Sequence, residues 1–324
     1  MLNTKKRLTD VGRFFIHLPE QNKFMKKILS IFSLFFLTTC FAQTEGYSRN
    51  IDGSQTFYKI YGKGEPLLII NGGPGMNSNG FEALAKKLSE KYQTILYDQR
   101  GTGKSVLKEL NAETINMKLM AEDIESLRKH LKIEKWSILG HSFGGIMVAH
   151  YATMYPESIK KIIFSASGGI DLGLREYASA NITSKLNRIE RDSLNYYGAK
   201  IAAGDTSKKT LLGRGRALAP AYLYNKKHVP LLAERLTQGN SRINELVWED
   251  LDKIKFDCKP KLKNFNQPVL IIQGKQDVIK SETAEIAHKV LQNSKVVYLD
   301  NCGHYGWLDA EEEYFTSLFN FLKS

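Results

Sequence analysis

Residues 136–145 read WSILGHSFGG, and this stretch decides which fold the sequence predicts. An apolar, strand-like run leads into the pattern G-x-S-x-G, with Ser142 between Gly140 and Gly144, and a helical stretch follows at 146–155. A sharp turn from strand to helix brings backbone segments together and leaves no room for side chains beside the serine. The stretch therefore predicts a strand-to-helix turn that exposes the Ser142 hydroxyl as a nucleophile.

Short apolar runs alternate with amphipathic stretches on both sides of this motif. Runs that are apolar at every position, such as 67–70 and 269–272, are typical of strands buried on both faces of a parallel sheet. We predict strands at 56–61, 66–71, 93–98, 136–140, 161–165, 269–273 and 295–299, and helices between them at 81–91, 117–131 and 281–291. This alternation predicts an α/β protein with a mostly parallel, doubly wound sheet.

One connection between predicted strands is far longer than the others. It spans 96 residues, 170–265, whereas connections in α/β units usually take about 2 to 6 residues beyond their helix. Helical periodicity recurs inside it at 184–197, 231–236 and 243–254. We therefore expect a core formed by 43–169 and 266–324, with an inserted helical cap at 170–265.

A serine nucleophile needs a base, and the base needs an acid that orients it. In folds with this serine turn the chain order is serine, then aspartate or glutamate, then histidine. Asp277 follows the predicted strand 269–273, and His304 follows the predicted strand 295–299. The carboxyl ends of parallel strands are where open α/β sheets bind ligands, so both residues are placed to meet Ser142. The other histidines of the expected mature chain, which lie in helical stretches, in the insertion or beside the serine, are His130, His141, His150, His228 and His288.

An acyl-transfer site also needs two N–H donors for the oxyanion. We expect one from Phe143, directly after the nucleophile, and one from Gly73 in the loop 71–75, which reads NGGPG. This chemistry requires no metal and no organic cofactor. A nucleotide site is excluded as well, because 101–105 matches the end of a P-loop while its first glycine position holds Asp98.

The sequence resembles the α/β-hydrolase fold family, and within it the proline iminopeptidase branch. The resemblance spans nearly all of 47–324, and its most specific elements are the loop 71–75, similar to HGGPG, and residues 98–105, similar to DQRGxGxS. It implies a catalytic triad of Ser142, Asp277 and His304 and the release of N-terminal proline from peptides. The family usually has histidine where this chain has Asn71, and G-G-S-W-G at the serine turn.

Three functions remain open at this point. The first is an aminopeptidase for N-terminal proline or another small residue, in which acidic residues of the cap hold the terminal amine; Glu234, Glu245 and Glu249 are candidates. The second is a carboxylesterase or other small-acyl hydrolase, because G-H-S-x-G is common to that group. The third is a ligand-binding protein without catalysis on the same fold.

The net charge argues against a nucleic-acid partner. The 324 residues carry 46 Lys and Arg against 34 Asp and Glu, a surplus of +12. Residues 1–42 hold +5 of it and the insertion 170–265 holds +7, so the remaining body is neutral. The partner that we expect is therefore a small molecule or a short peptide, and the sequence does not determine the oligomeric state.

The N-terminus resembles a secretory signal. Two lysines precede the apolar run 28–37, and small residues follow up to Ala42, with Met25 as a possible true start. The run is shorter than the roughly 20 residues of a membrane span. We expect removal of 1–42 and a periplasmic or secreted protein, or alternatively a lipoprotein anchored at Cys40. Cys258 and Cys302 would then either pair as a disulfide or remain as buried thiols.

We expect the intact mass of the protein isolated from its own cells to correspond to a chain that begins at Gln43. The reason is that signal cleavage follows small residues such as Ala42. An acylated Cys40 at the N-terminus would indicate the lipoprotein instead, and a chain that retains Met25 would contradict both forms of export.

Overall fold

A computed structural model describes residues 43–323 of the chain. The predicted leader 1–42, with Met25 and Cys40, lies outside the described residues. No helix among residues 43–323 has the length and apolar character needed to cross a bilayer.

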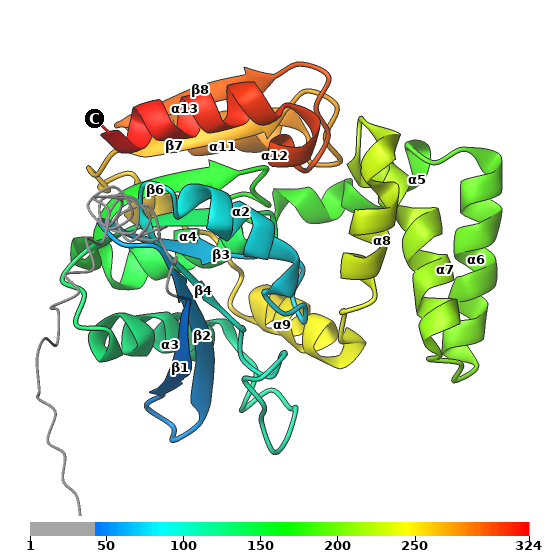
Figure 1. Cartoon of the computed structure of the whole chain (residues 1–324), viewed down its shortest axis with the longest axis horizontal. Coiled ribbons are helices and arrows are strands. Elements are labelled where there is room, and N and C mark those ends of the chain that lie inside the picture. Colours follow the sequence, from blue (N-terminus) through cyan, green and yellow to red (C-terminus); the bar gives the residue numbers. More distant parts are fainter. Residues whose placement is uncertain (1–42, 324) are drawn as a thin grey trace, which may run out of the picture. The chain divides into compact units, whose positions relative to one another are not determined.

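An eight-stranded sheet is the centre of the fold (Figure 1). Its order is β1-β2-β4-β3-β5-β6-β7-β8. The strands are β1 (Thr44–Arg49), β2 (Gln55–Tyr61), β3 (Pro66–Ile70), β4 (Gln93–Tyr97), β5 (Trp136–His141), β6 (Ile159–Ser165), β7 (Val269–Gly274) and β8 (Ser294–Leu299). The strands from β4 to β8 pair in parallel, and only the β1–β2 and β2–β4 pairs are antiparallel. The predicted fold class, a mostly parallel doubly wound sheet, is confirmed.

β1 is the strand that the sequence pattern did not predict. Its sequence, TEGYSR, contains no apolar run, because β1 is an edge strand and most of its residues are exposed. An edge strand in an antiparallel pair needs only one buried face. Such a strand therefore contains too few apolar residues for the sequence pattern to predict it.

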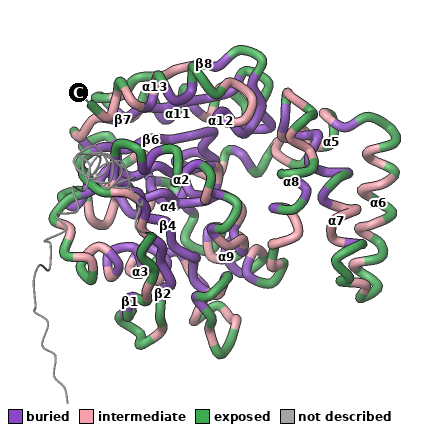
Figure 2. Tube along the Cα trace, in the orientation of Figure 1, coloured by how far each residue is buried: buried purple, intermediate pink, exposed green. Residues whose placement is uncertain are grey.

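The inner strands β3, β5 and β7 are buried on both faces, as their continuous apolar runs predict (Figure 2). In β3, Leu67 and Ile69 pack into one core layer, while Leu68 and Ile70 pack into the other. The first layer is covered by α2 (Glu82–Leu88), α12 (Gly306–Asp309) and α13 (Glu311–Lys323). The second is covered by α3 (Met117–His130), α4 (Phe143–Met154), α10 (Lys259–Leu262) and α11 (Ser281–Val290).

The long connection between β6 and β7 is helical. It contains α5 (Ala178–Ser184), α6 (Arg188–Ala202), α7 (Lys208–Leu218), α8 (Val229–Leu236) and α9 (Ser241–Lys253), followed by α10. The short 3-10 helices of the described chain are η1 (Asn79–Phe81), η2 (Pro156–Ser158), η3 (Gly173–Glu176), η4 (Ala219–Tyr222) and η5 (Lys226–His228). Helices α6, α7 and α8 lie side by side (Figure 1). The division into a core and a separate cap at 170 and 265 stays a prediction.

The two cysteines of the described chain are free thiols, so of the two alternatives the structure shows buried thiols. They lie in different core layers, Cys258 with α3 and α4 and Cys302 with α12 and α13. Burial raises the pKa of the Cys258 thiol to about 12, which leaves it protonated and unreactive at neutral pH.

A buried ion pair ties the β4 end of the sheet to α3. The Arg100 guanidinium donates to both carboxylate oxygens of Asp123, from Nε at 2.8 Å and from Nη2 at 2.5 Å. Its Nη1 donates to Asp52 at 2.5 Å. Both Arg100 and Asp123 are almost completely buried, so each charge depends on the other for compensation.

We expect Arg100→Met to lower the free energy of unfolding by about 3 to 5 kcal/mol, because it leaves the Asp123 carboxylate buried without its cation. Urea unfolding followed by circular dichroism measures this change. Lys87→Met is the control, since Lys87 forms an exposed pair with Glu90 and should cost less than about 1 kcal/mol. Equal effects of the two substitutions would contradict the prediction.

Candidate active site

Ser142 occupies the turn between β5 and α4. Its backbone has φ 55° and ψ −120°, a conformation that residues other than glycine rarely adopt. The flanking glycines have no space for a side chain: a Cβ at Gly140 would lie 2.5 Å from the Gly144 carbonyl oxygen, and a Cβ at Gly144 would lie 2.1 Å from that of Ile70. The G-x-S-x-G pattern is therefore a packing requirement of this turn.

Asp277 and His304 are in direct contact, as candidates for an orienting acid and a base must be. The Nδ1 of His304 lies 2.8 Å from Oδ1 of Asp277, and both side chains are buried. Asp277 also accepts a hydrogen bond from the Ile279 N–H at 3.0 Å and one from the Gln273 side chain at 2.9 Å. The backbone N–H of His304 donates to the Tyr222 carbonyl at 2.8 Å. These bonds fix the carboxylate and the ring on either side of their contact.

The structure places this pair near Ser142 without joining them directly. The His304 ring lies 4.6 Å, centroid to centroid, from the ring of His141, the residue before Ser142. Within residues 43–323 no hydrogen bond runs from the Ser142 hydroxyl to His304. In enzymes without bound substrate this bond is often long and tightens only in the complex.

His141 is buried in an aromatic cluster. Its ring packs against Phe81, His304, Tyr305 and Trp307 at centroid distances between 4.6 and 5.4 Å. Burial lowers the pKa of His141 well below its usual value, with further lowering from His304 and Arg235. The His141 ring, which is 1% exposed, fills the space beside His304, and sequence reasoning did not anticipate this packing.

The glycine loop after β3 lies against Ser142. A Cβ at Gly72 would lie 2.6 Å from Cβ of Ser142, so the loop backbone touches the serine directly. Gly73 has φ 74°, and its N–H makes no hydrogen bond within the described residues. Phe143 is the first residue of α4, where backbone N–H groups have no partner inside the helix. Both predicted oxyanion donors thus lie on segments that adjoin Ser142.

Residues of α8 and α9 hold this loop from the outside. Arg235 Nη2 donates to the Gly72 carbonyl at 2.8 Å, Asn244 donates to that of Pro74 at 3.2 Å, and the Asn240 N–H donates to that of Gly75 at 3.0 Å. Sequence reasoning missed these residues, because they come from the insertion more than 160 positions away and belong to no motif.

A cavity of about 560 Å³ opens beside Gly73 and Pro74. Residues of α6, α7 and α9 line its other side, and Arg214 and Glu245 are its charged lining residues. Of the three acidic candidates for binding an amine, only Glu245 borders this cavity; Glu234 and Glu249 are exposed elsewhere. We refer to this space as the Gly73 cleft.

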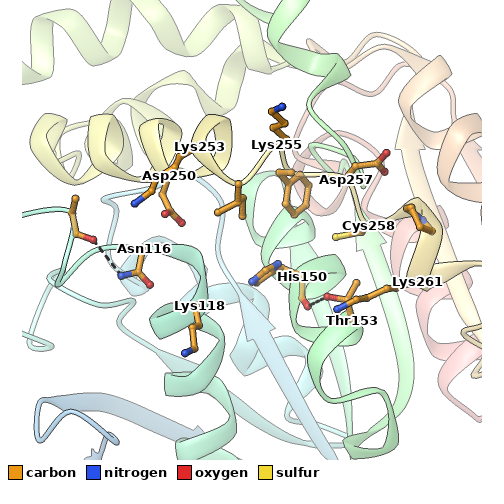
Figure 3. A pocket seen from close by; sticks show the side chains of 14 residues that line it. Asn116, Lys118, His150, Thr153, Asp250, Lys253, Lys255, Asp257, Cys258 and Lys261 are labelled. Atoms are coloured by element: carbon orange, nitrogen blue, oxygen red, sulfur yellow. Dashed lines mark hydrogen bonds between the residues drawn. The ribbon is translucent and has the colours of Figure 1, made fainter.

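A larger cavity of about 660 Å³ lies among α3, α4, α9 and α10 (Figure 3). Its lining includes Lys118, His150, Asp250 and Cys258. Ser142, Asp277 and His304 line neither cavity, but the Gly73 cleft is bordered by the loop that touches Ser142, whereas this larger cavity is not. The described residues contain no cluster of three or more His, Cys, Asp or Glu side chains that could hold a metal ion.

Comparison with known proteins identifies the same fold. The family model for the alpha/beta hydrolase fold matches residues 65–311. A proline iminopeptidase from Heyndrickxia coagulans is 27% identical over 87% of this chain and 99% of its own length. One from Saccharolobus solfataricus is 27% identical over 86% of this chain and 92% of its own length.

Solved structures of esterases and other hydrolases share the architecture. An esterase from Exiguobacterium antarcticum matches with a TM-score of 0.64 at 21% identity, over 87% of this chain and all of its own. A 2-hydroxy-6-oxo-6-phenylhexa-2,4-dienoate hydrolase from Rhodococcus sp. strain RHA1 matches with a TM-score of 0.66 at 19% identity, over 87% of this chain and all of its own. At such identities the likeness concerns the fold alone.

We expect Ser142→Gly to be more stable than Ser142→Ala by about 1 kcal/mol. Both remove the hydroxyl, but only glycine relieves the strained backbone, and that relief of about 1 to 3 kcal/mol exceeds the entropy that glycine costs. Thermal and urea unfolding of the two variants measure the difference. An alanine variant as stable as the glycine variant would show that the turn is not strained.

Proposed function

The chain belongs to the α/β-hydrolase fold family, and from that premise we propose that it is a serine hydrolase with Ser142 as nucleophile. His304 acts as general base and Asp277 as the acid that orients it. The observation that carries this proposal is the buried 2.8 Å contact between Asp277 and His304, beside the turn that presents Ser142. The mechanism that follows is part of the same proposal.

In the first step His304 Nε2 takes the proton of the Ser142 hydroxyl as its oxygen attacks the substrate carbonyl. Asp277 accepts from Nδ1–H, so the ring is held with Nε2 free, and the carboxylate stabilises the imidazolium that forms. His304 then protonates the leaving group, and an acyl-enzyme on Ser142 remains. Water activated by His304 attacks this ester and releases the acid.

The N–H groups of Phe143 and Gly73 serve as the oxyanion donors. Each belongs to a segment fixed by packing: Phe143 begins α4, and the loop of Gly73 is held by Arg235, Asn240 and Asn244. Donors that are already in place do not have to reorganise when charge develops, and each such donor typically contributes a factor of about 10² to 10³ in kcat.

For the substrate we propose a peptide with an N-terminal proline or another small residue, so that the enzyme is an aminopeptidase. The support comes from the proline iminopeptidases that match over most of this chain, and from the NGGPG loop at 71–75. Glu245, which borders the Gly73 cleft, is the acidic group available there for the terminal ammonium.

A carboxylesterase is the second candidate, and the environment of Glu245 favours it. The Glu245 side chain is 60% exposed and lies 3.5 Å from the Arg242 guanidinium, so its charge is already shared. A site that binds an ammonium ion should offer a carboxylate that is not already paired with a cation of the protein. A ligand-binding protein without catalysis is a weaker third candidate. The contact between Asp277 and His304 is the one that an orienting acid and its base require, and mere binding of a ligand does not need it.

We also propose that the mature protein is exported. The support is the signal-like order of 25–42, with lysines, an apolar run and small residues. Periplasmic or secreted protein and a lipoprotein anchored at Cys40 remain the two forms of this proposal.

We expect the protein to hydrolyse proline p-nitroanilide with a higher kcat/KM than acetyl or butyryl p-nitrophenyl esters, relative to the spontaneous rate of each substrate. Ser142→Ala should lose turnover by a factor of about 10³ or more and keep the wild-type circular dichroism spectrum, because only the nucleophile is removed. Ser184→Ala, in an exposed turn of α5, is the control.

Each other outcome has a distinct meaning. Cleavage of the esters without cleavage of the anilide would replace the aminopeptidase by the carboxylesterase. Turnover that survives in Ser142→Ala would overturn the nucleophile. No turnover of any substrate would favour the ligand-binding protein.

A further inference from the structure

Arg214 presents an uncompensated positive charge to the Gly73 cleft. It lies on α7, is half-buried and lines the cleft together with Gly73, Pro74 and Met76. Within residues 43–323 its guanidinium forms no ion pair and no hydrogen bond. Burial raises the pKa of the Tyr222 hydroxyl, and the positive charge of Arg214 lowers it in part. The Tyr222 ring in turn lies 5.4 Å from that of His304.

The packing of α7 fixes the direction in which Arg214 points. Its neighbours on the helix, Gly213 and Gly215, have no space for side chains. A Cβ at Gly213 would lie 2.3 Å from the Tyr197 ring of α6, and a Cβ at Gly215 would lie 2.5 Å from the Ala233 carbonyl oxygen of α8. Successive helical residues point about 100° apart, so with the two glycines against α6 and α8 the residue between them faces a third direction, the cleft.

A second guanidinium without a carboxylate lies behind the same loop. Arg235 is 5% exposed; its Nη2 donates to the Gly72 carbonyl, its Nε donates to the Tyr305 hydroxyl at 3.4 Å, and its guanidinium lies 4.6 Å from the centre of the Phe81 ring. Its Nη1 has no hydrogen-bond partner among the described residues. No carboxylate among residues 43–323 lies within 4.0 Å of either arginine. A buried cation is costly without an opposite charge, so the surroundings of Gly72 and Gly73 favour an anion.

The cleft offers less negative charge than positive charge to a substrate. Among residues 43–323, Glu245 is the only carboxylate that lines it, and Glu245 forms an exposed pair with Arg242. The polar groups that line the cleft include Thr206, Thr237 and Asn240, which can hydrogen-bond to a carboxylate but carry no charge to compensate a cation. A substrate group that enters this cleft therefore meets one free guanidinium and no free carboxylate.

We propose that Arg214 binds a carboxylate on the leaving group of the substrate, so that the natural substrates are short peptides or esters with a free carboxylate on the leaving-group side of the scissile bond. This inference rests on the proposed hydrolase function and names its substrate class. For peptides, the group is the C-terminal carboxylate of a dipeptide; for esters, it is a carboxylate carried by the alcohol part. Longer peptides and neutral esters lack a carboxylate within reach of Arg214.

Two matched substrate pairs test the inference by kcat/KM at low salt. The first pair is the dipeptide Pro-Ala and its C-terminal amide, and the second is (4-acetoxyphenyl)acetic acid and its amide, in which the charge likewise lies on the leaving group. We expect the charged member of the pair that the enzyme cleaves to exceed its neutral partner by at least about tenfold, as a charge-assisted hydrogen bond typically gives. In Arg214→Gln this preference should fall to about one.

Arg216→Gln is the control. Arg216 lies two residues along α7, is exposed and does not line the cleft, so its loss removes the same charge from the helix without touching the site. The preference for the charged substrate should stay as in the wild type. Equal loss in the two variants would show that only the general positive charge of α7 matters, and it would overturn the role of Arg214.

A binding measurement separates this inference from the proposed function. Calorimetric titration of Ser142→Ala with Pro-Ala and with its amide requires no turnover; we expect tighter binding of the acid, and loss of this difference when Arg214→Gln is added. Turnover without a preference for the charged substrates would overturn the inference and leave the hydrolase intact. Absence of turnover together with selective binding of the acid would overturn the hydrolase and leave the carboxylate site.

Discussion

The close approach of backbone at the Ser142 turn is the constraint on which the rest of the site depends. The Gly144 backbone packs against the Ile70 carbonyl at the end of β3, and Gly72 touches the Ser142 side chain. No residue with a side chain fits at either glycine. The end of β3, the end of β5 and the start of α4 are thereby held in contact, and Ser142 between them has the backbone angles φ 55° and ψ −120°.

The same constraint explains why the helical insertion matters to the chemistry. A loop that touches the serine must be stiff, yet residues 72–75 lie beyond the last hydrogen bond of β3. Their carbonyls are held instead by Arg235, Asn240 and Asn244, all from the insertion. The insertion is thus part of the proposed oxyanion site. Some positive charges of the insertion 170–265 therefore lie close to the predicted nucleophile, as Arg235 does through its bond to Gly72.

The charged residues beside the loop 71–75 distinguish between the candidate substrates more clearly than the fold does. The family and its relatives point to hydrolysis, and the proline iminopeptidases point to peptides. Near Gly73, Arg214 and Arg235 have no carboxylate within 4.0 Å among residues 43–323, while Glu245 pairs with Arg242. An aminopeptidase is compatible with this balance when the substrate is short enough to bring its own carboxylate to Arg214.

The sequence by itself determined the α/β fold, the serine turn and the two residues that could complete a triad. Those features depend on local patterns: continuous apolar runs, glycines beside Ser142, and Asp277 and His304 directly after strand ends. Only the tertiary structure decided that Arg235 holds Gly72, that His141 packs on His304, that Arg214 faces the cleft, and that Cys258 and Cys302 are separate thiols. Each of these joins segments far apart in the chain, and the packing of helices on the sheet sets such contacts without leaving a periodic signal in either segment.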